Sequence, residues 1–229
     1  RPVQKSEYIG GSTTTYRYGY DGAGRLFNVC ENGVHKRHYD YDSNSNRASI
    51  RTCSGSPSCD LGSDNPCSGT DVGGSYDVQD RMTSYGSATY TYTDNGELLT
   101  KTGGGQTTTY TYDVFGNLRT VALPSGNHID YVIDGRNRRI GKKVNDSLTK
   151  GVLYEGQLRI VAEKDGYGNI VSQFVYGTKV NVPEYMIRNN TTYRIITDQL
   201  GSVRLVVNAS TGAIAQRIDY DEFGVVTSD

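Results

Sequence analysis

A short motif that recurs about every 20 residues is the strongest constraint on the fold of this chain. It is most complete at Tyr110–Leu118, which reads Tyr-Thr-Tyr-Asp-Val-Phe-Gly-Asn-Leu. Tyrosine alternates with threonine there, so an extended strand places both tyrosines on one face. Asp113 suits the first position of a type I turn, and Gly116 suits the fourth, where a positive φ is easy for glycine. The motif predicts a β-hairpin with a tyrosine face.

Further copies of the motif occur along the whole chain. Tyr18–Leu26 is a full copy, with Asp21 and Gly24 at the turn positions, and Tyr220–Gly224 repeats the pattern with Asp221 and Gly224. In the copy that begins at Tyr39, Asn46 is expected to replace the glycine. A period near 20 residues indicates repeats that pack against their neighbours. The tyrosines expected to share one face are Tyr18, Tyr20, Tyr39, Tyr41, Tyr90, Tyr92, Tyr110 and Tyr112.

Composition agrees with a long sheet rather than a thick aliphatic core. Only 35% of the residues are hydrophobic, and the chain has 19 Tyr against 4 Phe and no Trp. A phenol ring has an apolar body and a hydroxyl that needs a partner or water. No segment shows a 3.6-residue apolar period over 11 or more residues, so almost no helix is expected. The sequence predicts an all-β fold.

The repeated Tyr-x-Tyr-Asp-x-x-Gly motif resembles that of the YD-repeat, or RHS, family of bacterial shell proteins and teneurin-type barrels. The resemblance covers residues 1–229 as a single repeat array, and residues 193–226 are similar to the segment that leads into the RHS-associated core. The resemblance implies tandem hairpins that form one curved, spiralling sheet, as the wall of a shell or barrel. The beginning at Arg1 and the end at Asp229 suggest a processed or excised piece.

By resemblance, the function is that of a non-catalytic structural wall segment in a secreted or cell-surface scaffold that encapsulates a toxin or other cargo. Its partners would be further YD repeats in the same chain or other copies of itself. One alternative is a self-assembling wall or tube made by association of sheet edges. Another is an adhesion module that binds glycans, because aromatic side chains on a sheet can stack on sugars.

Other classes of function find little support in the sequence. The net charge of −1 gives no long-range attraction for nucleic acid, and no apolar run approaches the roughly 20 residues of a membrane helix. The three histidines accompany no Gly-x-Ser-x-Gly motif, so no catalytic residue, enzyme activity or cofactor is predicted. Residues 40–46 alternate Asp and Asn like a calcium loop but lack its glycine and its final glutamate. They are interpreted as a turn, and no metal site is predicted.

The arginines also follow the repeat. Arg25, Arg47, Arg81 and Arg119 lie at or near turns of the repeat. We expect them to pair with turn carboxylates and to cover phenol rings.

A break in the period marks an insertion at residues 52–74. It is rich in Ser, Gly, Pro and Asp, and it holds three of the four cysteines. Two disulfides are expected, Cys30–Cys53 between neighbouring strands and Cys59–Cys67 within the loop, which implies an oxidising compartment. A zinc site and free thiols remain alternatives, although the loop has no Cys-x-x-Cys pair and no nearby histidine.

Overall fold

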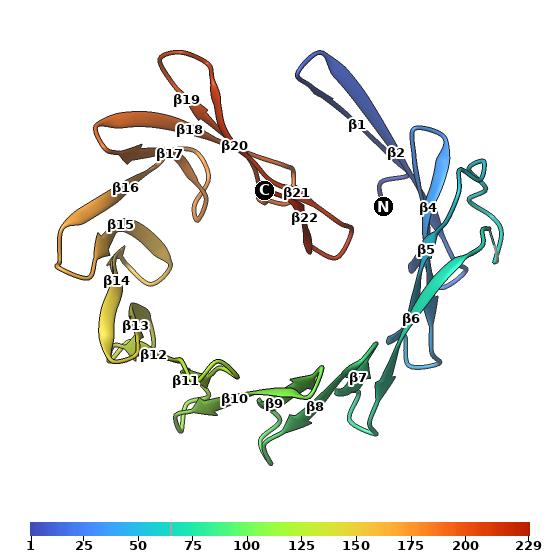
Figure 1. Ribbon diagram of the computed structural model, residues 1–229. Helices are drawn as coiled ribbons and strands as arrows, with labels where there is room; N and C mark the ends of the chain where they lie inside the picture. Colours follow the sequence, from blue (N-terminus) through green and yellow to red (C-terminus); the bar gives the residue numbers. More distant parts are fainter. Residues whose placement is uncertain (65) are drawn as a thin grey trace. The chain divides into compact units, whose positions relative to one another are not determined.

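A computed structural model describes residues 1–64 and 66–229. The described residues form 22 β-strands and no α-helix, which confirms the predicted all-β fold. Twenty strands belong to one antiparallel sheet in which strands that follow each other in the chain are neighbours, and β21 and β22 form a separate pair (Figure 1). Tandem hairpins therefore build the sheet.

The chain divides by its internal contacts into two compact units, Arg1–Thr107 and Thr108–Asp229. The sheet of each unit is curved (Figure 1). The first unit holds β1 (Gln4–Ile9), β2 (Ser12–Tyr20), β3 (Leu26–Glu31), β4 (Val34–Tyr41), β5 (Arg47–Cys53), β6 (Gly69–Tyr76), β7 (Met82–Tyr85), β8 (Ala88–Tyr92) and β9 (Leu98–Gly103).

The second unit begins within β10, and the same hairpin pattern continues there. Its strands are β10 (Gln106–Tyr112), β11 (Leu118–Ala122), β12 (His128–Ile133), β13 (Arg139–Val144), β14 (Ser147–Glu155), β15 (Arg159–Asp165), β16 (Ile170–Tyr176), β17 (Pro183–Arg188), β18 (Thr191–Thr197), β19 (Val203–Asn208), β20 (Ile214–Arg217), β21 (Asp219–Tyr220) and β22 (Val226–Ser228).

The turn between β10 and β11 shows how the motif folds. The Asp113 amide donates to the Asn117 carbonyl, the Gly116 amide donates to the Asp113 carbonyl, and each of these bonds is 3.0 Å long. The Asp113 carboxylate accepts the amides of Phe115 and Asn117, each at 3.0 Å. Gly116 has a φ of 78°, and the strand register shifts between Thr111 and Tyr112. This is a type I turn followed by a one-residue bulge, the conformation for which glycine is suited.

The same pair of backbone hydrogen bonds recurs at turns that begin with Asp21, Asp42, Asp77, Thr93, Leu123, Asp134, Asp165, Asp198 and Asp221. The fourth residue of every one of these turns has a positive φ, and these residues are Gly24, Ser45, Asp80, Gly96, Gly126, Asn137, Gly168, Gly201 and Gly224.

Two of these turns differ from the sequence interpretation. The expectation for Asn46 is wrong, because Ser45 has the positive φ of 71° and Asn46 is the next residue, whose carbonyl accepts the Asp42 amide. The motif does not identify the turn at Leu123, because leucine replaces the aspartate there. Its signals in the sequence are Pro124 at the second position and Gly126 at the fourth.

Burial follows the alternation of the strands. The eight tyrosines expected on one face are all buried or half-buried, whereas Thr91 and Thr111, each between two of them, are exposed. Fully buried side chains are few and concentrate in the first unit, around Val29, Cys30 and Tyr39. Stacking of successive tyrosine pairs on one another remains a prediction.

The insertion is shorter than residues 52–74. Strand β5 continues to Cys53, and β6 begins at Gly69, so residues 69–73 pair with β5 instead of forming a loop. The loop contacts the β3–β4 hairpin: the His35 amide donates to the Pro57 carbonyl, and the Cys59 amide donates to the Gly33 carbonyl.

The disulfides connect Cys30 to Cys59 and Cys53 to Cys67, so the expected pairing is wrong. Cys30 lies on β3 and Cys53 on β5, with β4 between these two strands. Two strand spacings amount to roughly 9.5 Å, which exceeds the Cα–Cα distance that a disulfide spans. Cys53 instead lies opposite Gly69, close to Cys67, and the Cα atoms of Cys53 and Cys67 are 5.5 Å apart.

Candidate functional site: contacts between successive hairpins

The last tyrosine before a turn reaches back to the preceding hairpin. The Tyr41 hydroxyl donates to the Leu26 carbonyl at 2.6 Å, and Leu26 is the first residue of β3. Burial raises the pKa of the Tyr41 phenol, which keeps it a hydrogen donor. The same bond to the preceding hairpin is made by Tyr76 to Arg47, Tyr92 to Met82, Tyr154 to Arg139 and Tyr176 to Ile160.

Arginines cover the rings of these tyrosines. The Arg25 side chain donates to the Asp21 carboxylate of its own turn at 2.7 Å, and its guanidinium carbon lies 4.7 Å from the centroid of the Tyr41 ring. A cation over an aromatic face is attracted by the negative face of the ring. The same arrangement joins Asp77, Arg81 and Tyr92, and also Asp134, Arg138 and Tyr154.

The other two arginines singled out in the sequence contact similar partners. Arg47 lies over the rings of Tyr39 and Tyr85, at 6.0 and 5.5 Å. Arg119 approaches the Asp113 carboxylate at 3.9 Å. The sequence predicts two roles for the repeated arginines, pairing with a turn carboxylate and covering a phenol ring. Each of the four arginines is confirmed in at least one of these roles.

Arg25, Arg81 and Arg138 each follow the positive-φ residue of a turn. Asparagine can replace arginine at this position, and its side chain then connects one turn to the next. The Asn46 side chain donates to the carboxylates of Asp42, at 3.1 Å, and Asp80, at 2.8 Å. Asn44 also donates to Asp80, and the bonds from both asparagines lower the pKa of the Asp80 carboxyl. The Asp40 carboxylate bonds elsewhere, to His38 and Ser49. Residues 40–46 thus form a turn and its contacts, as interpreted from the sequence.

The first residues of the chain make the same type of contact. The Tyr20 hydroxyl donates to the Pro2 carbonyl at 2.8 Å, and the Arg1 guanidinium lies 5.9 Å from the centroid of the Tyr20 ring. Arg1 and Pro2 therefore contact Tyr20 as Arg25 and Leu26 contact Tyr41. By this correspondence, β1 occupies the position of the second strand of a hairpin in the repeat.

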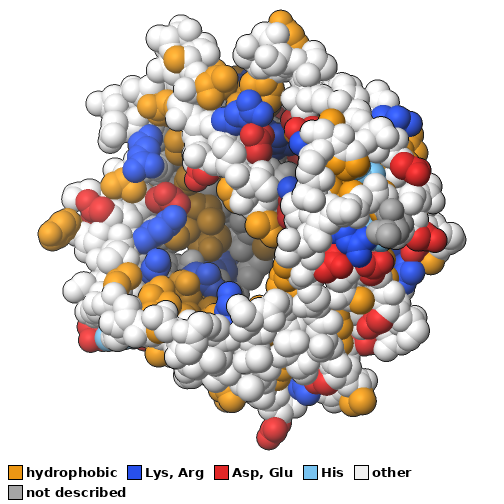
Figure 2. Space-filling view, turned by 45° about the vertical axis from the view of Figure 1, so that its right-hand side comes forward, with side chains coloured by type: hydrophobic (Ala, Val, Ile, Leu, Met, Phe, Trp, Pro, Cys, Tyr) orange, Lys and Arg blue, Asp and Glu red, His pale blue; other side chains and the backbone are white. Residues whose placement is uncertain are grey.

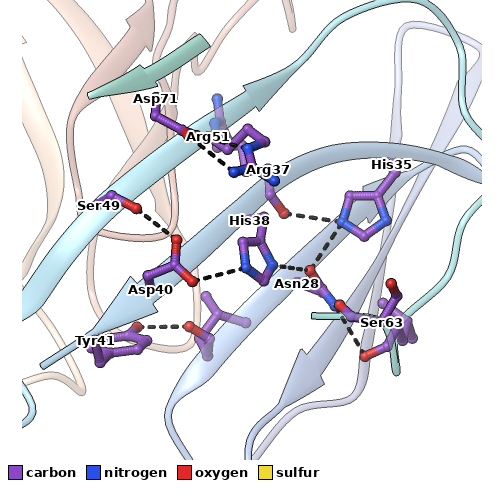
Figure 3. Close-up of polar contacts among 12 residues, drawn as sticks. Asn28, His35, Arg37, His38, Asp40, Tyr41, Ser49, Arg51, Ser63 and Asp71 are labelled. Atoms are coloured by element: carbon purple, nitrogen blue, oxygen red, sulfur yellow. Dashed lines mark hydrogen bonds and ion pairs between the residues drawn. The ribbon is translucent and has the colours of Figure 1, made fainter. Parts of the chain in front are cut away.

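A buried polar cluster lies beside these contacts in the first unit, where Asn28 of β3 lies between two histidines of β4 (Figure 3). The Asn28 amide nitrogen donates to the Leu61 and Ser63 carbonyls of the insertion, at 3.2 and 2.8 Å. These two bonds fix the orientation of the amide, so its oxygen faces His38 Nδ1 at 2.7 Å and His35 Nε2 at 3.1 Å. Asn28, His35 and His38 are 0%, 1% and 2% exposed.

The partners of the two histidines indicate which ring nitrogens carry hydrogens. His38 faces the Asn28 oxygen with Nδ1 and the Asp40 carboxylate with Nε2, and both partners are acceptors. His35 Nε2 faces two acceptor oxygens, whereas its Nδ1 lies 3.9 Å from the Cys30 sulfur. Burial lowers the pKa of His35, in keeping with a neutral ring protonated at Nε2.

This cluster has the residue types of a hydrolase site in a different arrangement. Ser49 donates to Asp40 at 2.7 Å, and the other oxygen of Asp40 faces His38. A serine nucleophile would instead bond to the histidine that removes its proton. The bonds of the cluster hold the insertion against β3 and β4.

The insertion also explains a glycine in the tyrosine motif. A Cβ atom at Gly19 would lie 2.5 Å from the Leu61 carbonyl oxygen, which is closer than real Cβ contacts allow. The insertion therefore crosses β2 where Tyr18 and Tyr20 flank a residue without a side chain. The corresponding residues in other copies are Thr91 and Thr111.

The surface carries charges of both signs. On the face shown in Figure 2, Lys and Arg side chains are interspersed with Asp and Glu. The described part of the chain also contains no helix long and apolar enough to cross a membrane.

The family comparison supplies the identity of these repeats. The family described as Teneurin YD-shell matches residues 3–229. The chain belongs to this family. Teneurin-4 of Mus musculus is 25% identical over 235 residues, which cover 100% of this chain and 8% of that protein. The tRNA3(Ser)-specific nuclease WapA of Bacillus spizizenii is 25% identical over 189 residues, 81% of this chain and 7% of that protein. The YD-shell chain thus spans less than a tenth of each relative.

Solved structures with similarity to this YD-shell chain include toxin complexes. The TcdB2-TccC3-TEV crystal structure has 9% sequence identity and a TM-score of 0.38, covering 93% of this chain and 15% of the other. The Photorhabdus luminescens Tc holotoxin pore has 15% identity and a TM-score of 0.37, with coverage of 93% and 14%.

Proposed function

We propose that this chain is a non-catalytic wall segment of a secreted or cell-surface YD shell. The observation that carries the proposal is the repeated contact in which a tyrosine hydroxyl bonds to the backbone of the preceding hairpin and an arginine covers its ring. Such contacts bind each hairpin to the next and let a sheet grow by addition of repeats. The two disulfides support an oxidising compartment.

The cargo of the shell would be a toxin or another polypeptide. This rests on membership of the YD-shell family and on the name of one relative, a nuclease of which this chain matches only 7%. In that arrangement the chain supplies part of the enclosing wall, and the activity belongs to a different segment.

Limited proteolysis of the natural gene product that contains this chain tests the enclosure. A double change of Tyr92→Phe and Arg81→Gln removes one contact between hairpins, and the control is Tyr8→Phe at a tyrosine that is 75% exposed. Cargo that becomes protease-sensitive in the double variant alone supports a wall role. Cargo that is cleaved equally in all three proteins contradicts enclosure.

A separate assay tests the absence of catalysis. The isolated chain, with its disulfides formed, is incubated with a tRNA mixture in the presence and absence of Mg²⁺. We expect intact tRNA. Cleavage that disappears after His38→Gln or Asp40→Asn would overturn the non-catalytic role.

Association through a sheet edge is a second candidate, and the phase of β1 favours it. Because Arg1 and Pro2 contact Tyr20 as one repeat contacts the next, the outer edge of β1 is positioned to pair with the first strand of a hairpin. Another repeat of the same protein or a second copy could supply that strand. Light scattering over a hundredfold range of concentration tests the second possibility. A constant monomer mass would contradict association between copies.

A further inference from the structure

Three potential metal ligands converge in the second unit. His128 and Asp130 lie two residues apart on β12, and Asp146 lies in the turn between β13 and β14. His128 Nε2 is 3.5 Å from an Asp130 carboxylate oxygen and 3.3 Å from an Asp146 carboxylate oxygen. One ligand atom from each residue lies within 4.8 Å of the other two. The three groups approach one another from two adjacent hairpins.

The backbone around Asn145 fixes this arrangement. Asn145 and Asp146 have positive φ values of 48° and 66°, as in the two-residue turns that connect twisted strands. The Asn145 amide donates to the His128 carbonyl, the His128 amide donates to the Asn145 side-chain oxygen, and both bonds are 3.0 Å long. The Asn145 side chain also donates to Asn127 at 2.8 Å. The turn that carries Asp146 is thereby attached to the start of β12.

The two distances from His128 Nε2 to the carboxylate oxygens, 3.5 and 3.3 Å, are close to the spacing of ligands around one metal ion. The N···O distance of an N–H···O hydrogen bond is most often about 2.9 Å. Both distances from His128 Nε2 are longer than this. Zinc bonds of about 2.0–2.1 Å to nitrogen and oxygen place the ligands of a tetrahedron about 3.3 Å apart. A neutral imidazole and two carboxylates are also suitable ligands for zinc.

We propose that His128, Asp130 and Asp146 bind a divalent transition metal ion, with Zn²⁺ the preferred ion, and that the ion cross-links β12 to the β13–β14 turn. The side chains are 40%, 30% and 88% exposed, so solvent can occupy the fourth coordination position. Lys143 is the cross-strand neighbour of Asp130, and its positive charge opposes binding of a cation. The site would fasten the β13–β14 turn to β12 in the second unit, as the disulfides fasten the insertion to β3 and β5 in the first.

Calorimetric titration of the untagged chain with ZnCl2, with CaCl2 and MgCl2 as comparison ions, tests the site. We expect one Zn²⁺ per chain and binding weakened at least tenfold by His128→Gln or Asp146→Asn. Lys143→Gln should tighten binding. The control is Asp94→Asn, which removes an exposed carboxylate from a turn elsewhere and should leave binding unchanged. Zinc at a hundredfold excess over its Kd should raise the Tm by roughly 5–10 °C.

Two results would overturn the proposal. One is the absence of saturable Zn²⁺ binding by the unchanged chain, and the other is equal affinity of His128→Gln and the unchanged chain. Circular dichroism establishes whether each variant is folded. Visible absorption of the Co²⁺-substituted chain gives a second readout, because tetrahedral coordination produces intense bands that the His128→Gln variant should lose.

Discussion

The hydroxyl of Tyr41 donates a 2.6 Å hydrogen bond to the backbone carbonyl of Leu26, which belongs to the preceding hairpin. Tyr41 ends β4 and Leu26 begins β3, so the bond connects two hairpins at the level of their turns. Arg25 covers the Tyr41 ring and holds the Asp21 carboxylate of the earlier turn. The tyrosine, arginine and aspartate of the motif therefore act together across the boundary between repeats.

Tyr41→Phe should lower the free energy of unfolding by about 1 kcal/mol, the usual net value of one hydrogen bond. The ring and its contact with Arg25 are retained, so the change isolates the hydroxyl. Urea denaturation measures the loss, with Tyr8→Phe as the control because Tyr8 is 75% exposed. Equal stability of the two variants would show that the bond to Leu26 contributes nothing.

Gly96→Ala should destabilise the chain by about 1–2 kcal/mol, because an L-residue resists left-handed backbone. Gly96 has a φ of 94°, and a Cβ atom there would contact nothing within 4 Å. Gly135 provides a matched control, since it also lies in a turn with open space but outside the positive-φ region. Denaturant melts should show Gly135→Ala within about 0.5 kcal/mol of the unchanged chain. A similar cost at both glycines would contradict the conformational explanation.

Loss of either disulfide should destabilise the first unit, and loss of Cys30–Cys59 should cost more. The two bridges join residues 29 and 14 apart in sequence. Loop-closure entropy then gives about 3.6 kcal/mol for Cys30–Cys59 and about 3.0 kcal/mol for Cys53–Cys67. Cys30 is also fully buried. Double alanine variants of each pair, compared by urea denaturation, measure the order.

Peptide mapping without reduction checks the connectivity independently of stability. We expect peptides that join Cys30 to Cys59 and Cys53 to Cys67. Recovery of a Cys30–Cys53 peptide from native protein would contradict the structure.

Arg138 should hold the Asp134 carboxyl ionised to low pH. The hydrogen bond from the Arg138 side chain, helped by backbone amides, lowers the Asp134 pKa from 3.8 to about 2. A lowered carboxyl pKa contributes stability above the unfolded value of 3.8, and this contribution is lost as the pH falls from 3.8 towards 2. NMR titration of the carboxyl carbon should give the low pKa, and Arg138→Gln should move it towards 3.8. An unchanged titration in the variant would contradict the role of Arg138.

The repeated hairpins could be predicted from the sequence because their determinants are local. Alternation of Tyr and Thr before Asp113, and Gly116 after it, specifies a strand and a turn within nine residues. The sequence does not single out Ser45 as the positive-φ residue, because several turn-forming residues surround it and only the backbone distinguishes it from Asn46.

The contacts made between distant residues could not be predicted in the same way. The disulfide pairing depends on β4 lying between β3 and β5, and therefore on the sheet rather than on residue spacing. The buried Asn28 likewise gives no local signal, since its partners are Leu61 and Ser63 of the insertion. The convergence of His128 and Asp146 requires the pairing of β12 with β13 and the conformation of the next turn.

The buried His35 should make the first unit less stable in mild acid. Burial, aided by the neighbouring His38, lowers the His35 pKa below its ordinary value of 6.5, although the bond to the Arg37 carbonyl and the charge of Asp60 oppose this shift. Between the folded pKa and 6.5, His35 binds more protons in the unfolded chain than in the folded chain. The free energy of unfolding therefore falls as the pH decreases through 6.5. Other charged groups near the cluster are Asp40, Arg51 and Asp71. Proton NMR should show His35 titrating below 6.5, and urea midpoints should fall between pH 7.5 and pH 5. A His35 pKa at or above 6.5 in the unchanged chain would contradict this prediction. This test does not depend on whether a His35→Gln variant folds.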